Sequence, residues 1–323
     1  MNKFKTRVKH FAKNSQVGMA FIISFLLFVI TINLNPSSLN VNAIGSIITL
    51  TLILMIASAG QTLVVISDGI DMSVGATMTF TALIATSIMK SQEDVILVFY
   101  ALIAVLVVGA IIGFINGIGA AKIGLPPLIV TLSIRNVVTR LQYVYSGGKP
   151  TGRASQWFTQ SVTYRHFGFI PNGLIYALII FAIVFYLLKY TRYGQQLFLI
   201  GNNKRAAELT GIKSVKIKVM NYVFAGMLAG FAGLIGAGYM NFVSGGAFES
   251  YTIMSIVAVV IGGTILSGGK GSYVGTLAGA LLMVVLSNSL AVLNLSQSVK
   301  DIIMGIVLIV LLAAYNREKP VRQ

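Results

Sequence analysis

Cysteine is absent from this chain of 323 residues, and histidine, proline and acidic residues are scarce. Without cysteine there is no disulfide, no thiolate nucleophile and no cysteine-ligated metal. The two histidines, His10 and His166, are far apart in the sequence and lie near charged stretches, so a histidine-rich metal site is not expected. We therefore predict no metal site in this chain.

Motifs of nucleotide hydrolysis and of common hydrolases are missing as well. The segment Gly268–Ser272 places Lys270 among glycines, but a phosphate-binding loop needs serine or threonine directly after that lysine, where this chain has Gly271. Neither HExxH nor GxSxG occurs. We expect no catalytic residue, no enzyme activity and no cofactor bound by this chain.

Apolar residues are abundant instead. They make up 56% of the chain, against 10% charged residues, and they fall into about ten long blocks. Since a helix needs roughly 20 apolar residues to cross a bilayer, we predict an all-α fold, a polytopic transmembrane helical bundle of about ten spans. The predicted spans are 17–34, 41–66, 74–89, 95–121, 125–145, 172–190, 219–241, 251–266, 274–293 and 299–315.

The distribution of positive charge predicts how these spans are oriented. We divide the chain into a basic tail (1–16), a transmembrane permease domain (17–315) with one long inner segment (191–218), and a short tail (316–323). With the N-terminus in the cytoplasm, inner segments hold 17 lysines and arginines and outer segments hold four. This asymmetry follows the positive-inside rule, so both termini are predicted to be cytoplasmic. Topology also explains the net charge of +16, and no nucleic-acid partner is expected.

Charged residues inside the apolar blocks point to function. Asp68 and Asp71 lie in the segment 62–76, TLVVISDGIDMSVGA, and of the eight acids only these two look buried. A charge at membrane depth costs roughly 2.5–3.5 kcal/mol. The pair could bind a coupling ion in a secondary carrier. Alternatively, it could shape a break in the helix, with a salt bridge to Arg135 or Arg140.

Two segments have the composition of helix breaks. One contains Asp68 and Gly69, and the other contains the pairs Gly262-Gly263 and Gly268-Gly269. Both follow a Val-Ile pair and precede a Val-Gly pair, which forms a faint internal repeat of the kind that transporters carry. Broken helices at membrane depth are tolerated where they face protein or a water-filled cavity.

Two polar segments lie between spans. In the inner one, Asn202 or Asn203 can cap a short helix over Lys204–Thr210, and Gly211 stands where a C-cap glycine belongs. The alternative is a basic loop that only sets topology. The outer segment (146–171) carries the only tryptophan, Trp157, and other aromatic residues. It is either an interfacial aromatic belt or a docking surface for an external partner.

Five ordered motifs resemble the permease subunits of ribose-type, or simple-sugar, ATP-binding-cassette (ABC) importers, and the resemblance covers almost the whole chain. The motifs are SDGIDMSVGA (67–76), GFINGIGAAKIGLPPLIVTL (113–132), YSGGKP (145–150), GNNKRAAELTGI (201–212) and AVVIGGTILSGGKGSYVGTLAGALL (258–282). The resemblance implies a permease for a monosaccharide in the bacterial cytoplasmic membrane. It also implies an ABC ATP-binding subunit that binds the ATP, an extracytoplasmic sugar-binding protein, and a second permease copy, identical or different.

The resemblance also implies roles for individual residues. The inner segment would contain the coupling helix that docks on the ATPase, with contacts from Asn203, Arg205, Ala206, Ala207, Glu208 and Gly211. Because sugar hydroxyls need hydrogen-bonding groups, we place the substrate path at Gln61, Asp71, Asn116 and Asn136. Permeases for nucleosides and for branched-chain amino acids belong to the same superfamily, so these substrates stay open, as does an ion-coupled carrier that uses Asp68 and Asp71.

Overall fold

The computed structural model describes residues 16–36 and 40–315, and the predicted tails lie outside them except for Gln16. The described chain is helical apart from two short strands, β1 (Arg165–His166) and β2 (Ile170–Pro171), so the all-α class is confirmed. The helices are α2 (Gln16–Leu34), α3 (Val41–Ile66), α4 (Val74–Met89), α5 (Val95–Gly117), η2 (Ile118–Lys122), α6 (Pro127–Ser146), α7 (Gln156–Thr163), α8 (Gly173–Tyr190), α9 (Arg192–Asn202), α10 (Lys204–Leu209), α11 (Ser214–Met240), α12 (Tyr251–Ile261), α13 (Tyr273–Val292) and α14 (Gln297–Tyr315).

Each predicted span coincides with a helix. The boundaries of α3 and α4 agree with the prediction, and Asn40 caps α3 by accepting a hydrogen bond from the backbone of Asn42. The predicted span 251–266 is wrong at its end, because Gly262 and Gly263 leave the helix and Gly263 has a φ of 86°. Among residues 16–36 and 40–315, five helices are long and apolar enough to cross a membrane: α3, α5 with η2, α8, α11 and α13. The count of ten spans and the side on which the termini lie stay predictions.

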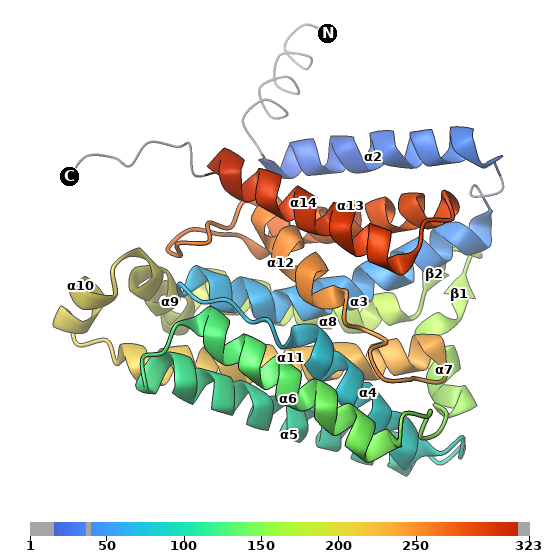
Figure 1. Ribbon diagram of the computed structural model, residues 1–323, viewed down its shortest axis with the longest axis horizontal. Helices are drawn as coiled ribbons and strands as arrows, with labels where there is room; N and C mark the ends of the chain where they lie inside the picture. The colour runs from blue at the N-terminus through green and yellow to red at the C-terminus, as the bar shows by residue number, and fades with distance from the viewer. Residues whose placement is uncertain (1–15, 37–39, 316–323) are drawn as a thin grey trace, which may run out of the picture.

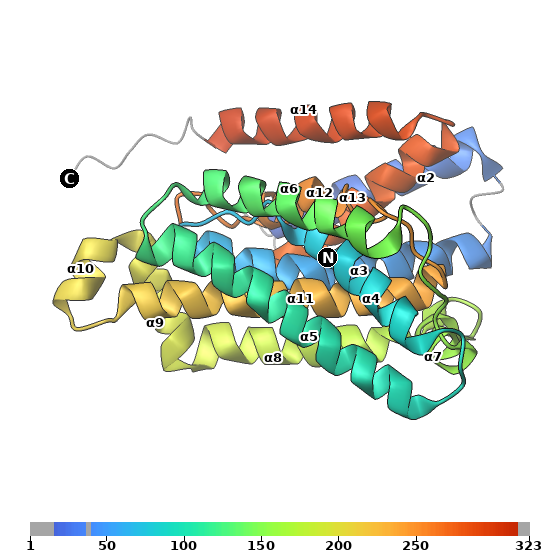
Figure 2. The same ribbon diagram turned by 60° about the horizontal axis from the view of Figure 1, so that its bottom comes forward.

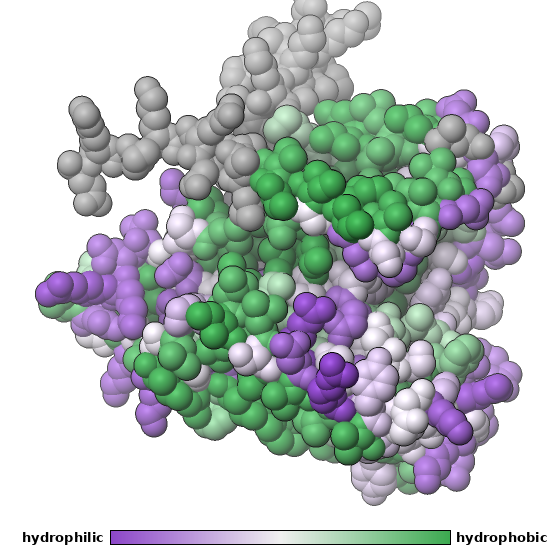
Figure 3. Space-filling model, viewed as in Figure 1, coloured by the Kyte–Doolittle hydropathy of each residue, from purple (hydrophilic) through white to green (hydrophobic). Residues whose placement is uncertain are grey.

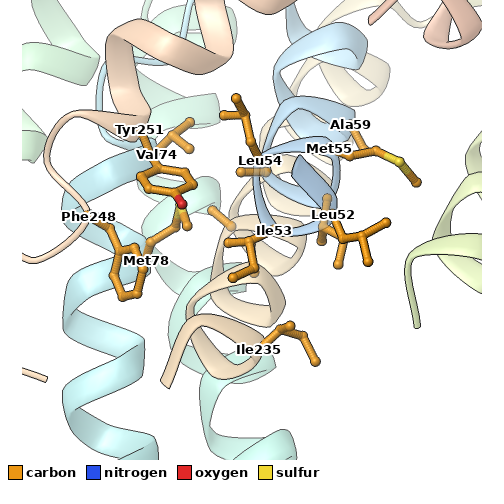
Figure 4. Packing of buried hydrophobic residues seen from close by; sticks show 14 of the residues in the cluster. Leu52, Ile53, Leu54, Met55, Ala59, Val74, Met78, Ile235, Phe248 and Tyr251 are labelled. Atoms are coloured by element: carbon orange, nitrogen blue, oxygen red, sulfur yellow. The ribbon is translucent and has the colours of Figure 1, made fainter. Parts of the chain in front are cut away.

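Helices α3 and α11 form the centre of the bundle (Figure 1). Helix α11 packs against α3, α4 and α5, while α12, α13 and α8 cover other sides of α3. Helix α2 packs on α13, and α14 packs on α12. Figure 4 shows the apolar core between these elements, where Ile53 and Leu54 from α3 lie near Met78 from α4 and Tyr251 from α12.

Small residues bring α5 and α11 into close contact. A Cβ atom added to Gly109 would lie 2.2 Å from the carbonyl oxygen of Gly226, and one added to Gly226 would lie 2.1 Å from the carbonyl oxygen of Gly109. Membrane helices lack a hydrophobic drive to associate in lipid, so such close backbone packing supplies much of their attraction. The high glycine content of the chain therefore serves helix packing here.

Polar elements gather at the two ends of the bundle. Helices α9 and α10 lie at one end, and α7 with the β1–β2 hairpin lies at the other (Figure 1). The surface between these ends is mostly hydrophobic (Figure 3). Helix α7 was not predicted from the sequence, although its signals are present: Ser155 caps its start, and Phe158 and Val162 are buried four residues apart. The end that carries α9 and α10 is the predicted cytoplasmic end.

Candidate functional site

The first helix break lies between α3 and α4. Asp71 is 2% exposed, and its Oδ1 accepts hydrogen bonds from the Ser73 backbone N–H at 2.8 Å and from Ser73 Oγ at 2.6 Å. Asn116 on α5 donates from Nδ2 to Ser73 Oγ at 2.8 Å. The break is therefore closed by a buried polar chain that links Asp71, Ser73 and Asn116.

Neighbouring helices hold the same break in place. The backbone N–H of Met72 donates to Thr131 Oγ1 of α6 at 3.0 Å. The ring of Tyr222 on α11 leaves no room beside Gly69, where an added Cβ would lie 2.7 Å from the hydroxyl. Burial raises the pKa of the Asp71 carboxyl, and the two Ser73 hydrogen bonds act in the opposite direction. Asp71 is thus a buried structural group of the loop between two helices.

Asp68 differs from Asp71 and corrects the sequence-based expectation. It follows Ser67, the C-cap of α3, with a φ of 59°, and its side chain is 61% exposed. Lys218 Nζ lies 3.9 Å from its carboxylate and donates to its carbonyl oxygen at 3.3 Å. The prediction that both aspartates are buried is wrong, because the left-handed residue at the helix end turns Asp68 toward the surface. The predicted salt bridge to Arg135 or Arg140 is wrong too.

The second break, between α12 and α13, is built from backbone. Gly262 and Gly263 follow α12, and an added Cβ on Gly275 would lie 1.9 Å from the carbonyl oxygen of Gly262. A hydrogen bond between the hydroxyls of Thr62 on α3 and Thr276 on α13, at 2.9 Å, joins the start of α13 to α3. The break is therefore packed so tightly that only glycine fits at the crossing.

Both breaks meet at the end of α9. The backbone N–H of Gly269 donates to the carbonyl oxygen of Ile66 at 2.9 Å, which joins the second break to the end of α3. An added Cβ on Gly201 would lie 1.9 Å from that same oxygen, and one on Gly268 would lie 3.0 Å from Cβ of Asp68. The inner segment and the two breaks thus form one junction with direct backbone contact.

Helix α10 projects from this junction (Figures 1 and 2). Asn203 ends α9 and begins α10, and its Oδ1 accepts from the backbone N–H of Ala206 at 3.0 Å. Gly211 has a φ of 84°, which suits glycine, and the N–H of Ile212 returns to the carbonyl of Ala207 at 3.2 Å. Leu209 is 85% exposed at the end of this helix. Helix α10 is thus a short helix fixed at both ends, with an apolar side chain exposed near its end.

A charged pair at mid-helix of α6 was not predicted. Arg135 donates from Nη2 to Glu249 Oε2 at 2.8 Å, and Thr139 donates to Glu249 Oε1 at 3.0 Å. Gln142 Oε1 accepts from the backbone of Gly246 at 3.2 Å. These three α6 side chains attach the loop before α12. Glu249 looks like a loop acid in the sequence, and no local signal identifies Arg135 as its partner.

The residues predicted for the substrate path differ in burial and do not form one group. Gln61, Asp71 and Asn116 are buried, and the last two are joined through Ser73, whereas Asn136 is exposed on the outer face of α6. Within the described part of the chain, neither polar atom of the Gln61 side chain has a hydrogen-bond partner. Residues 16–36 and 40–315 contain no group of three or more acidic or histidine side chains that could hold a metal ion.

Comparison with known proteins adds a family to this geometry. Residues 43–312 match the family described as branched-chain amino acid transport system / permease component. The chain is 35% identical to a ribose import permease of Bacillus subtilis (strain 168), with 93% of each chain covered. It is 31% identical to a ribose import permease of Escherichia coli (strain K12), covering 96% of this chain and 97% of that one. It is 29% identical to a fructose import permease of Rhizobium meliloti, covering 95% and 87%. No solved structure matches the chain significantly.

Proposed function

Because the chain belongs to the ribose-type family of ABC importer permeases, we propose that it is the subunit through which a monosaccharide crosses the bacterial cytoplasmic membrane. The resemblance inferred from the five motifs is confirmed. The relatives are named for ribose and fructose, which favours a sugar with several hydroxyl groups. Ribose is our first candidate.

The observation that carries the proposal is the junction below α10. A permease without a phosphate-binding loop must receive the work of ATP hydrolysis from another subunit through a rigid contact. Helix α10 offers such a contact, because Asn203 and Gly211 fix its ends and Leu209 is exposed. Its base touches both helix breaks through Gly201 and Gly269. We therefore propose that a separate ATPase docks on α10 and that its movement reaches the breaks through this junction.

The polar face of α6 supports a substrate path on one side of the bundle. Asn136 and Arg140 are exposed near the middle of this helix. In lipid each would be costly, so we place water or a second permease copy against this face. A hydrophilic group interrupts the hydrophobic surface over α6 and the adjacent loop (Figure 3). The Arg135–Glu249 pair borders the same face and can exchange hydrogen bonds with sugar hydroxyls. The predicted Asp71 and Asn116 lie behind it as support.

The opposite end of the bundle suits an extracytoplasmic sugar-binding protein. Trp157 is 46% exposed and Phe167 is 88% exposed there. Glu93 accepts hydrogen bonds from the backbone of Gln156 at 2.9 Å and of Trp157 at 3.1 Å, which fixes the start of α7. The aromatic-belt interpretation stays open for these residues.

A branched-chain amino acid is the second candidate substrate, because the family description names that class. The ion-coupled alternative is less favoured by the geometry. It requires two aspartates in one ion site, whereas Asp68 is exposed beside Lys218 and Asp71 is hydrogen-bonded to Ser73. The polar α6 face accepts hydroxyls as well as ammonium and carboxylate groups, so the choice of substrate needs an experiment.

Uptake into native host cells that lack this chain tests the proposal. Radiolabelled ribose, fructose, galactose and leucine are supplied with and without the restored gene. We expect the restored gene to recover uptake of one sugar, with uptake abolished by ATP depletion and preserved when an ionophore collapses the ion gradients. Recovery of leucine uptake would select the second candidate. Uptake that follows the ion gradient would contradict an ABC importer.

A further inference from the structure

An apolar groove of about 320 Å³ lies between α5 and α8. Its floor is α11, with Leu63 of α3 behind it. Every residue that lines it is apolar. Figure 2 shows α5 crossing α11 obliquely, so that α11 stays uncovered between α5 and α8 near the α9 end of the bundle. A groove of this size with no polar lining suits a hydrocarbon chain.

The groove opens toward the surroundings of the bundle. Ile183 of α8 lines it and is 54% exposed. In α5 and α8 only 22% of the apolar window is buried, against 67% in α3, so these two helices form the outer wall. The neighbour of an outer wall in a membrane is lipid. An acyl chain seated in the groove would fill it and pack against its apolar side chains.

Positive charge lies at the α9 end of the groove. Lys216, Met220, Phe224 and Leu228 are spaced four residues apart and so form one row along α11. The last two line the groove, and Lys216 is exposed two turns beyond them. The row of α11 side chains that begins in the groove therefore ends in a cationic side chain outside it.

A second cation comes from the start of α9. The ring of Tyr193 meets the ring of Phe224 edge-on, with centroids 5.9 Å apart, which places the first turn of α9 at the end of the groove. Arg192 is the preceding residue and is exposed. Among the residues that the structure describes, neither Arg192 nor Lys216 forms an ion pair with an acidic side chain. Both charges are available to an anionic headgroup.

We propose that this groove binds one acyl chain of an anionic phospholipid from the cytoplasmic leaflet, with the headgroup phosphate at Arg192 and Lys216. Basic sites between membrane helices on this side recognise such headgroups. The lipid would connect the start of α9 with the start of α11, the two ends of the segment that carries α10. This proposal rests on the predicted orientation, with α9 and α10 on the cytoplasmic side of the membrane. It does not depend on which substrate the chain transports.

Native mass spectrometry of the full chain, purified in detergent, tests the site. The probes are phosphatidylglycerol and phosphatidylcholine with identical acyl chains. We expect preferential retention of phosphatidylglycerol and a roughly 30-fold loss of its affinity in the double variant Arg192→Ala/Lys216→Ala. The matched control is Lys189→Ala, which removes one exposed cation on the opposite side of α8, where it lies over the Phe185 ring. The control should bind as the wild type does.

A second variant tests the acyl-chain part of the site. Leu187→Trp fills the groove and should abolish binding of both lipids, while the thermal midpoint of unfolding without lipid confirms that the variant is folded. If it does not fold, the surface double variant still decides the proposal. Equal binding of the two lipids, unchanged phosphatidylglycerol binding in the double variant, or loss in Lys189→Ala alone would overturn the assignment. So would a second copy of the chain that occupies the groove and excludes lipid.

Discussion

The two helix breaks solve the same problem in different ways. In the first, polar side chains from three elements satisfy the freed backbone, with Asp71, Ser73 and Asn116 in one buried chain. In the second, Gly262 and Gly275 allow two backbones to cross. The first can tolerate a change of side chain that keeps its hydrogen bonds, and the second can tolerate no side chain at all. The two breaks therefore differ in the substitutions that they tolerate.

The largest expected effect is on the glycine break. Gly275→Val places methyl groups where an added Cβ already lies 1.9 Å from the Gly262 carbonyl. Overpacking of a tight core costs about 1–3 kcal/mol or more, and this contact involves backbone that cannot rotate away. We expect loss of folded, monodisperse protein in fluorescence-detected size-exclusion chromatography.

The matched control is Gly305→Val on α14, where an added Cβ meets no atom within 4 Å. It should elute as the wild type does. Equal behaviour of the two variants would show that the α12–α13 crossing is less tightly packed than described.

A smaller loss of folding stability is expected at Asp71. Asp71→Ala removes the acceptor of two hydrogen bonds from Ser73 and leaves the donors buried, which costs about 1–3 kcal/mol. Asp71→Asn keeps an acceptor oxygen of the same shape and should retain most of the stability. The thermal midpoint in detergent measures both.

Asp68→Asn is the control for charge and position, since Asp68 lies in the same loop but is exposed, and asparagine also adopts its left-handed backbone with a φ of 59°. A surface pair contributes at most about 1 kcal/mol, so this variant should melt close to the wild type. A larger loss in Asp68→Asn than in Asp71→Ala would reverse our assignment of the buried group.

A stability effect smaller than that of Asp71→Ala is expected at Asn116. Asn116→Ala removes one donor to Ser73 Oγ, and that hydroxyl keeps its bond to Asp71. We expect a loss of stability of about 1 kcal/mol and a lower uptake rate, because Asn116 supports the break behind the proposed substrate path. An unchanged uptake rate at reduced stability would assign Asn116 a purely structural role.

Local patterns predicted the breaks and the short helix, while pairings over long sequence distance could not be predicted. Asn203 and Gly211 mark the ends of α10 because capping is a property of a few consecutive residues. The end of α12 was misplaced, since Ile265 and Leu266 continue the apolar run past Gly262. Hydropathy does not register the backbone geometry of glycine.

The side-chain network needed the fold. Arg135 and Glu249 are 114 positions apart, and nothing local brings them together. Helix periodicity alone does not say which face of α6 meets the bundle, so Asn136 was grouped with Gln61 although one is exposed and the other is buried. The same limit applied to Asp68 and Asp71, which share a motif but not an environment.

Docking of the ATPase on α10 can be tested by cysteine labelling, because the chain contains no native cysteine. Leu209→Cys places a thiol at a position that is 85% exposed, and Phe167→Cys places one at the opposite end, where the residue is 88% exposed. A membrane-impermeant maleimide should label Cys at 209 only in inside-out vesicles, and the assembled ATPase should protect it. It should label Cys at 167 in intact cells, with no such protection. Labelling at 209 that is unaffected by the ATPase would show that the ATPase does not dock on α10. Labelling at 209 from outside the cell would show that α10 does not lie on the cytoplasmic side.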